Sequence, residues 1–243
     1  MLRLRAGEPV GVTDGRGGYV PCRYLGGSDR AGARGVSGVV EPVGPAVFSS
    51  PRTPLLTVGF APVKGDRPEW AVQKLTELGV DRIVLVAAER AVVRWAGERA
   101  ASHLDRLAKI ARAAVMQSRQ VWVPEIVGPV PATALLSGLE PEPGRAAGTA
   151  VCQMGGPPPS VGLHTLLVGP EGGWSPDELS AAGSQVVGLG PAVLRAETAA
   201  VTAGVLMTAL RAGVVGPVPG PVPGPGPGPV PGPVPGPEAR VME

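Results

Sequence analysis

Cysteine, histidine and aromatic residues are scarce in this chain of 243 residues. The two cysteines, Cys22 and Cys152, form no Cys-x-x-Cys pair, which excludes a disulfide scaffold and a cysteine-rich zinc site. The two histidines, His103 and His164, have no partner at metal-ligand spacing, so we expect no metal centre. Aromatic residues make up only 3% of the chain, and a buried core therefore has to be built from aliphatic side chains.

Long apolar runs are also absent. No uninterrupted apolar stretch reaches the roughly 18 residues that a membrane span needs. The N-terminal residues MLRLRAGEPV contain two arginines but no apolar signal core. These features predict a reduced, cytoplasmic protein that does not interact with a membrane.

The net charge of +2 is small, but it is unevenly distributed. Residues 1–60 carry a net charge of +3 and residues 61–119 a net charge of +4, whereas residues 120–243 carry −5. A basic first half indicates an anionic partner such as nucleic acid, although an ordinary solvated surface gives the same pattern.

Three segments differ in pattern. Residues 1–54 contain short extended stretches with an Asp14-Gly15 hairpin signal, and they predict a small β domain. Residues 55–214 alternate apolar strands with amphipathic helices, which predicts an α/β domain with a parallel sheet and helices on both faces. Residues 215–243 are dominated by Pro, Gly and Val, and we expect a disordered tail without an assigned function.

The α/β pattern can be resolved into elements. We expect helices at 69–78, at about 104–118 and at 197–211, the first ended by Gly79. The expected strands are 55–62, 83–89, 121–127, 149–154, 165–169 and 185–190. Ligands of such sheets bind at the carboxyl ends of the strands.

The most informative motif is residues 165–182, TLLVGPEGGWSPDELSAA. An apolar strand enters a glycine loop, and Ser175-Pro176-Asp177-Glu178 then forms a capping box that predicts a helix start. The glycines allow a ligand to approach the backbone closely. The loop matches neither the dinucleotide-binding nor the P-loop pattern, and Glu171 suits a cationic or hydroxyl-bearing ligand. A plain strand-to-helix turn is the alternative interpretation.

A second strand-to-helix junction lies at residues 185–202. The strand ends in Gly188 and Gly190, and Leu194-Arg195-Ala196-Glu197-Thr198-Ala199 then opens the last helix. Arg195 and Glu197 are therefore positioned to project toward a site at the end of the sheet. The alternative is a surface ion pair of little energetic weight.

GPEGG after an apolar strand and LRAETA at the last helix together resemble the bacterial 16S ribosomal RNA uridine N3-methyltransferases, which belong to the SPOUT superfamily. Two upstream segments are similar to the same family. KGDRPEWAVQKLTELGV (64–80) resembles its Gln-Lys-x-x-Glu-Leu-Gly helix, and RLAKIARAAVMQSRQVWVPEI (106–126) resembles its Ala-rich helix ending in Gln-Ser-x-Arg. The resemblance covers residues 55–212 in the correct order.

The resemblance implies a trefoil-knotted SPOUT methyltransferase domain over 55–214, preceded by a PUA-like β-barrel over 1–54 that helps to bind RNA. It implies a homodimer that methylates N3 of a uridine in 16S rRNA of the small ribosomal subunit, with S-adenosylmethionine as cofactor. The implied cofactor-binding residues are Gly169, Pro170, Glu171, Gly172, Leu189, Gly190, Leu194, Arg195 and Thr198.

Methylation at uracil N3 requires loss of a proton, and it therefore requires a base or a stabiliser of the uracil anion. Arg195 is the candidate for stabilising the developing negative charge or a phosphate, and Glu171 is the candidate for accepting a proton or binding a hydroxyl. The candidates for contacts with RNA are Arg3, Arg5, Lys74, Arg94 and Arg119.

Two features depart from the family. The segment that usually precedes the Leu-Arg-Leu of the barrel has no counterpart here. Either the sequence starts too late or the barrel is truncated at its N-terminus. The Pro/Gly/Val tail has no family equivalent. Two other functions stay open: methylation at another RNA position such as a ribose 2′-hydroxyl, and a catalytically silent role in RNA binding or ribosome assembly. Cofactor binding and the identity of the modified atom distinguish these three alternatives.

Overall fold

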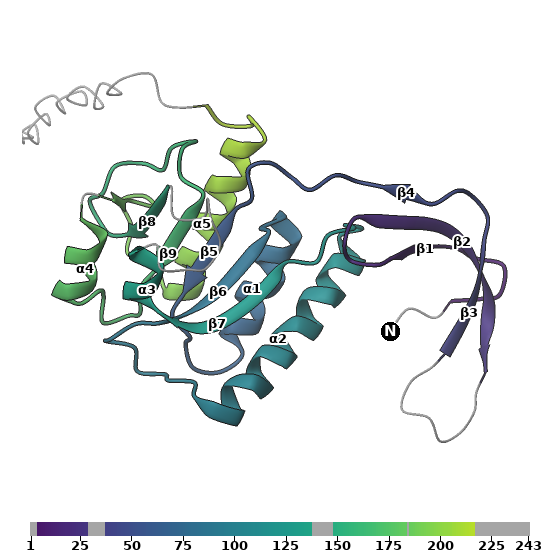
Figure 1. Cartoon of the computed structure of the whole chain (residues 1–243), viewed down its shortest axis with the longest axis horizontal. Coiled ribbons are helices and arrows are strands. Elements are labelled where there is room, and N and C mark those ends of the chain that lie inside the picture. Colours follow the sequence, from purple (N-terminus) through teal and green to yellow (C-terminus); the bar gives the residue numbers. More distant parts are fainter. Residues whose placement is uncertain (1–3, 29–36, 138–147, 184, 217–243) are drawn as a thin grey trace, which may run out of the picture.

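A computed structural model of the chain describes residues 4–28, 37–137, 148–183 and 185–216. An antiparallel sheet formed by the N-terminal segment lies beside an α/β domain formed by the rest of the described chain (Figure 1). Arg3 and most of the Pro/Gly/Val tail lie outside the described residues. Among the residues described, no helix has the length and apolar character needed to cross a membrane.

The N-terminal sheet consists of β1 (Pro9–Thr13), β2 (Gly18–Ser28), β3 (Ser37–Pro42) and β4 (Val47–Phe48). Its order is β1-β2-β3, with β4 also paired to β2, and all pairings are antiparallel. The predicted hairpin is confirmed, because the Asp14 carboxylate accepts the N–H groups of Arg16 (2.7 Å) and Gly18 (2.9 Å) and closes the β1–β2 turn.

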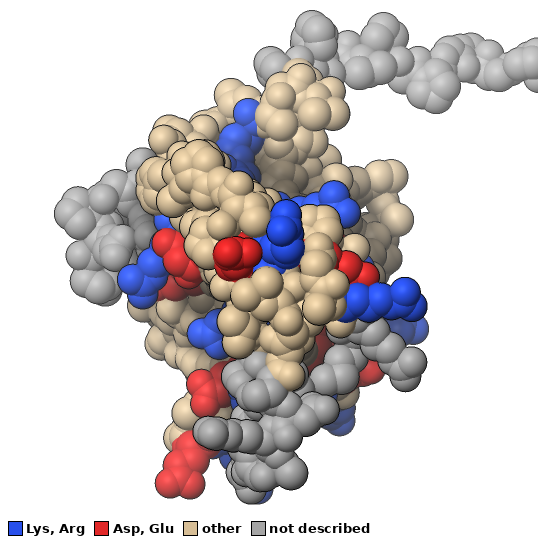
Figure 2. Space-filling model, turned by 90° about the vertical axis from the view of Figure 1, so that its right-hand side faces the viewer, with Lys and Arg blue, Asp and Glu red and all other residues tan. Residues whose placement is uncertain are grey.

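Most of this sheet is open to solvent. Cys22 is buried, whereas Val39, Val47 and Phe48 are each more than half exposed. Figure 2 shows the end of the molecule that carries the sheet, where basic and acidic side chains are interspersed among neutral ones. The segment therefore has little hydrophobic core of its own within the described residues.

The α/β domain is built on a six-stranded sheet whose strand order is β10-β8-β9-β5-β6-β7. All of its strand pairs are parallel, as the sequence predicts. Its strands are β5 (Thr57–Phe60), β6 (Arg82–Ala87), β7 (Glu125–Pro131), β8 (Thr149–Cys152), β9 (Thr165–Val168) and β10 (Val186–Val187). The strands β5 and β9 are completely buried, which explains their largely apolar sequence.

Helices cover both faces of the sheet. In β6, Ile83 and Leu85 belong to the core under α1 (Arg67–Leu78), α2 (Gly97–Gln117) and α5 (Ala196–Arg211). Val84 and Val86 belong to a second core under α3 (Ala132–Leu136) and α4 (Pro176–Ala182). Alternate residues of one strand thus supply two cores, and this arrangement holds the carboxyl ends of the strands in place.

Two helix boundaries follow from local signals in the sequence. Gly79 ends α1 in the left-handed conformation (φ 82°), as predicted. The Ser175 hydroxyl accepts the Glu178 N–H and the Glu178 carboxylate accepts the Ser175 N–H, so the predicted capping box is confirmed at α4. The short helix α3 has no such signal and is absent from our sequence prediction.

The predicted strand at 121–127 is wrong at its start, since β7 begins only at Glu125. The preceding residues pair instead with the N-terminal sheet: Gly17 N–H donates to the Val121 carbonyl (2.9 Å), and Val123 N–H donates to the Gly15 carbonyl (2.9 Å). The strands expected at 149–154 and 185–190 are also shorter, ending at Cys152 and Val187. After β10, the Gly188 N–H donates to the Pro157 carbonyl (2.8 Å) and not to a neighbouring strand.

A half-buried ion-pair cluster fixes the linker between the two sheets to the α/β domain. Asp81 follows α1, and its carboxylate accepts from Arg52 of the linker, from the Leu56 N–H and from Arg211 at the end of α5. Arg52 and Arg211 both donate to the carbonyl of Gly79 as well. The last helix and the linker are therefore held to the amino end of the sheet, opposite to the site described next.

Candidate active site

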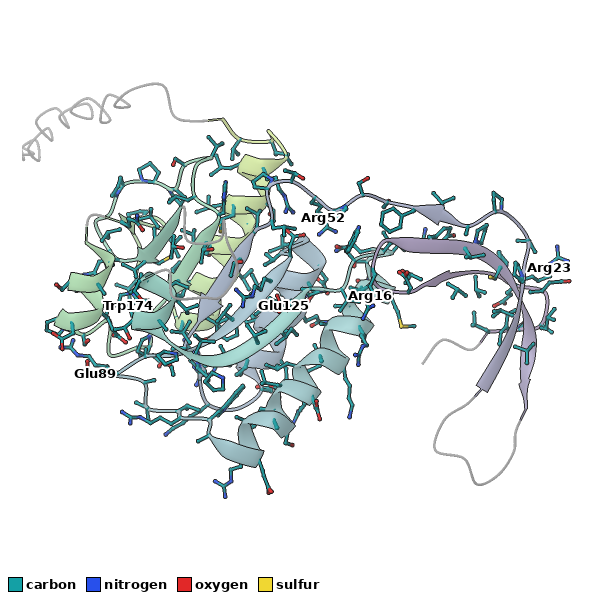
Figure 3. All side chains as sticks on the ribbon, viewed as in Figure 1. Arg16, Arg23, Arg52, Glu89, Glu125 and Trp174 are labelled. Atoms are coloured by element: carbon teal, nitrogen blue, oxygen red, sulfur yellow. The ribbon has the colours of Figure 1, made fainter. Side chains whose placement is uncertain are left out.

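A cavity of about 310 Å³ opens at the carboxyl ends of β8 and β9. In Figure 3, Trp174 lies at this edge of the sheet, whereas Arg52 lies at the opposite edge. The lining comes from three segments: residues 152–154, residues 168–174, and residues 189–199 at the start of α5. The cavity therefore lies where ligands bind in parallel α/β sheets.

The glycine loop after β9 forms one wall. A Cβ atom at Gly169 would lie 3.0 Å from Cε2 of Trp174, so glycine leaves room for the indole ring. Trp174 is itself buried, and its Nε1 donates to the Cys152 carbonyl at 3.2 Å. The indole thereby connects the loop to β8 and gives the cavity a rigid aromatic wall.

The segment after β10 forms the opposite wall. Gly190 has a φ of 130°, a conformation that side chains other than glycine rarely adopt. Leu189 and Leu194 add apolar surface, and Val193 between them is 82% exposed at the rim. The walls are thus mainly apolar, with polar contacts available from the backbone of the two glycine-containing loops.

The predicted cofactor-binding residues divide into two groups. Six line the cavity: Gly169, Pro170, Glu171, Leu189, Gly190 and Leu194. The other three lie just outside it. Gly172 faces Arg90, Arg195 is the exposed N-cap residue of α5, and Thr198 is exposed in the first turn of that helix.

Arg67, the first residue of α1, connects two acidic residues at the rim. Its Nη1 lies 3.8 Å from Oε1 of Glu171 and 3.6 Å from Oε1 of Glu197. Three segments that are distant in sequence therefore meet around one guanidinium. Arg67 could not be predicted as a site residue from the sequence, because nothing local to α1 indicates its partners.

Glu197 is an unusual member of this group because it is buried. Its Oε2 is inaccessible to solvent and has no hydrogen-bond partner among the described residues. A buried carboxylate oxygen without a hydrogen-bond partner destabilises the fold. Proteins retain such a group where it serves binding or catalysis, or where it binds an ordered water.

Cys152 is one of the residues that line the cavity. Burial raises the pKa of this thiol from 9.0 to about 12, because the thiolate would be poorly solvated. The thiol is therefore protonated at neutral pH and acts as a small apolar lining group rather than as a nucleophile.

The predicted RNA-binding residues lie on different parts of the surface. Arg5 is exposed near the N-terminal sheet, and Arg119 is exposed just after α2 with a φ of 56°. Lys74 on α1 donates to Glu77 at 2.8 Å, so its charge is partly neutralised. Arg94 lies in the loop between β6 and α2 and donates to the Glu89 carbonyl at 3.0 Å.

Comparison with known proteins gives the family. The model of the RNA methyltransferase domain matches residues 51–208. Ribosomal RNA small subunit methyltransferase E of Mycobacterium bovis is 34% identical over 221 residues, which span 84% of this chain and 79% of that protein. The chain belongs to the ribosomal RNA small subunit methyltransferase E family. The two segments that form the cavity walls lie within the matched domain.

Solved structures of related proteins share the fold of this methyltransferase E family member. A probable rRNA methyltransferase from Porphyromonas gingivalis superposes with a TM-score of 0.70 at 30% identity, covering 88% of this chain and 89% of that one. Ribosomal RNA small subunit methyltransferase E from Neisseria gonorrhoeae, bound to S-adenosylmethionine, superposes with a TM-score of 0.67 at 27% identity, covering 86% and 85%.

Proposed function

We propose that this protein transfers a methyl group from S-adenosylmethionine to N3 of a uridine in 16S rRNA of the small ribosomal subunit. The observation that carries the proposal is the cavity at the carboxyl edge of the sheet. Its walls are the same glycine loop and last-helix junction on which the family resemblance rests. Membership of the methyltransferase E family and the cofactor bound to the Neisseria gonorrhoeae relative add support.

The residues present fit this cofactor. A volume of about 310 Å³ is within the range of small-molecule sites. The apolar walls at Leu189, Leu194 and Trp174 suit an adenine ring, and the backbone groups of Gly169 and Gly190 can hydrogen-bond its edge. The Glu171 carboxylate at the rim suits a cationic or hydroxyl group of the ligand.

When bound, S-adenosylmethionine supplies an electrophilic methyl group. The protein's own residues have to orient the uracil and exclude water. They also have to accept the N3 proton or stabilise the negative charge that develops on the uracil as this proton leaves. We propose that Arg195, exposed at the N-cap of α5, stabilises the negative charge on a uracil oxygen or binds a phosphate. Glu171 accepts a proton or binds a hydroxyl, and Arg67 orients this carboxylate.

The family resemblance also supports proposals for the domains, the assembly and the RNA contacts of the chain. We propose that residues 55–214 form a trefoil-knotted SPOUT domain that acts as a homodimer. Residues 1–54 form a PUA-like β-barrel that assists RNA binding. Arg3, Arg5, Lys74, Arg94 and Arg119 contact RNA phosphates, and the ribosomal substrate implies a cytoplasmic location.

The test is methyl transfer from radiolabelled S-adenosylmethionine to small ribosomal subunits, and separately to 16S rRNA, isolated from a strain that lacks this methylation. We expect label in the 16S rRNA with at least one of these substrates. A folded protein that binds S-adenosylmethionine but labels neither substrate would contradict the proposed substrate. A folded protein that does not bind S-adenosylmethionine would favour the silent RNA-binding role instead.

A further inference from the structure

A second cavity, of about 510 Å³, opens at the same carboxyl edge of the sheet, beyond the ends of β6 and β7. It is lined by the loop between β6 and α2, by the junction of β7 with α3, and by the start of α4. None of the residues that line it also lines the candidate active site. In Figure 3, Glu89 of this cavity and Trp174 of the active site lie at the same end of the sheet.

The two cavities are neighbours. Trp174 lines the active-site cavity, and the next residue, Ser175, lines the second one. Arg90 of the β6–α2 loop reaches the active-site glycine loop, where its Nη1 lies 3.5 Å from the Gly172 carbonyl. The linings of the two cavities are therefore contiguous along the chain at residues 174 and 175.

The lining of the second cavity combines apolar side chains with one aromatic ring. Among the described residues, five alanines and three prolines belong to this lining. Trp95 supplies an indole to the lining. His103, which is not a lining residue, stacks on that indole with ring centroids 4.2 Å apart and planes at 10° to each other. The imidazole thereby holds the indole in one orientation.

Polar groups lie beside these apolar side chains. The lining includes the guanidinium of Arg94, the hydroxyl of Thr133 and the exposed carboxylate of Asp177. The Glu178 carboxylate is already used, since its two oxygens accept the N–H groups of Glu89 (2.9 Å) and Ser175 (2.8 Å). A fixed aromatic ring, a nearby guanidinium and a few hydrogen-bonding groups are the combination that binds single-stranded nucleic acid bases.

We propose that the second cavity binds a nucleobase of the RNA substrate, from a nucleotide next to the one that is methylated. Trp95 stacks on this base, Arg94 contacts its backbone, and Thr133 and Asp177 contact its polar edge. The inference rests on the proposed function for the identity of the polymer, but it assigns a separate site. This site fixes the register of the RNA and so selects which base enters the active site.

The experiment compares Trp95→Ala, Trp95→Phe and Ala96→Phe in the full-length protein. Ala96 lines the cavity and has an extended backbone (φ −145°, ψ 155°) that accepts an aromatic residue, so Ala96→Phe adds a bulky ring to the lining and leaves Trp95 and His103 unchanged. The matched control is Val92→Ala, because Val92 is 73% exposed in the same loop and does not line the cavity. Thermal unfolding checks that each variant is folded.

The readouts are the affinity for a fluorescein-labelled single-stranded RNA that contains the target uridine and its neighbours, and the KM and kcat for methyl transfer. We expect Trp95→Ala and Ala96→Phe to weaken RNA binding and raise KM by about tenfold, the usual effect of losing one base stack. S-adenosylmethionine affinity should not change, and Trp95→Phe should recover most of the RNA affinity.

RNA binding as strong in the folded Ala96→Phe variant as in the wild type would overturn the inference, whatever the methylation activity. The binding assay needs no turnover, so it separates this result from a failure of the proposed function. If the wild type transfers no methyl group but RNA affinity still falls in both variants, the proposed reaction fails and the base-binding site stands.

Discussion

The guanidinium of Arg67 lies 3.6 Å from the buried carboxylate of Glu197. The two residues are far apart in sequence, since Arg67 begins α1 and Glu197 lies in the first turn of α5. A cation at the N-terminus of α1 is opposed by the helix dipole, so the acidic partners are needed to retain it there. Glu171, which lines the active-site cavity, is the second partner. We interpret Glu197 as a residue that positions Arg67 and, through it, Glu171.

Substitutions of Glu197 test whether this residue positions Arg67. Glu197→Gln keeps the size of the side chain but removes the charge that holds Arg67, so kcat should fall by about tenfold, the equivalent of about 1.4 kcal/mol. Glu197→Asp should recover part of the activity, and the pH dependence of kcat should change in the Gln variant. An unchanged kcat and pH profile in a folded Glu197→Gln variant would contradict this role.

Arg195 provides the second prediction. Because its side chain is exposed at the N-cap of α5, Arg195→Ala should keep the fold and the thermal midpoint of unfolding. If it stabilises the developing charge on uracil, turnover should fall by about a hundredfold, as for other oxyanion donors. Single-turnover methyl transfer to 16S rRNA measures this loss, and full activity of the variant would refute the assignment.

The third prediction uses the glycine loop. In Gly169→Ala the new Cβ would press against the Trp174 indole and displace it, and such overpacking costs about 1–3 kcal/mol. Calorimetric titration should show a weaker affinity for S-adenosylmethionine, by about tenfold or more. Gly162→Ala is the matched control, since a Cβ there meets nothing within 4 Å. Equal affinities in the two variants would show that the loop does not contact the cofactor.

Cys152 gives a pH-dependent prediction. Burial raises the pKa of this thiol from 9.0 to about 12, so at pH 8 it should react with a thiol reagent much more slowly than a free cysteine. The unfolded chain loses its thiol proton first as the pH rises, so this group lowers the free energy of unfolding between pH 9.0 and about 12. Mass spectrometry after labelling identifies the modified cysteine. Rapid labelling of Cys152 in the folded protein at pH 8 would contradict its burial.

Much of the fold could be predicted from local sequence. The buried strand β9, the capping box at Ser175 and the αL glycine at Gly79 are each set by residues that are neighbours in the chain. The start of β7 could not be predicted in this way. Its preceding residues pair with the turn at Gly15 and Gly17, more than a hundred residues earlier, and this long-range pairing outweighs the apolar pattern.

The candidate site likewise contains residues that local sequence predicts and residues that it does not. The loop from Gly169 and the segment at Gly190 carry local signals, and the structure places both at one cavity. Arg67 and Trp95 have no local signal, because their roles depend on Glu197 and on the stacked His103. Residues whose function depends on partners in other elements become visible only once the fold brings those elements together.

The most direct test of the central claim is the chemical identity of the product. Small ribosomal subunits from a strain that lacks the methylation are incubated with the protein and S-adenosylmethionine, and the 16S rRNA is digested to nucleosides for mass spectrometry. We predict that 3-methyluridine appears and that it is absent without the protein. A 2′-O-methylated nucleoside in its place would contradict the proposed methyl acceptor, and the absence of any new methylated nucleoside would contradict the proposed activity.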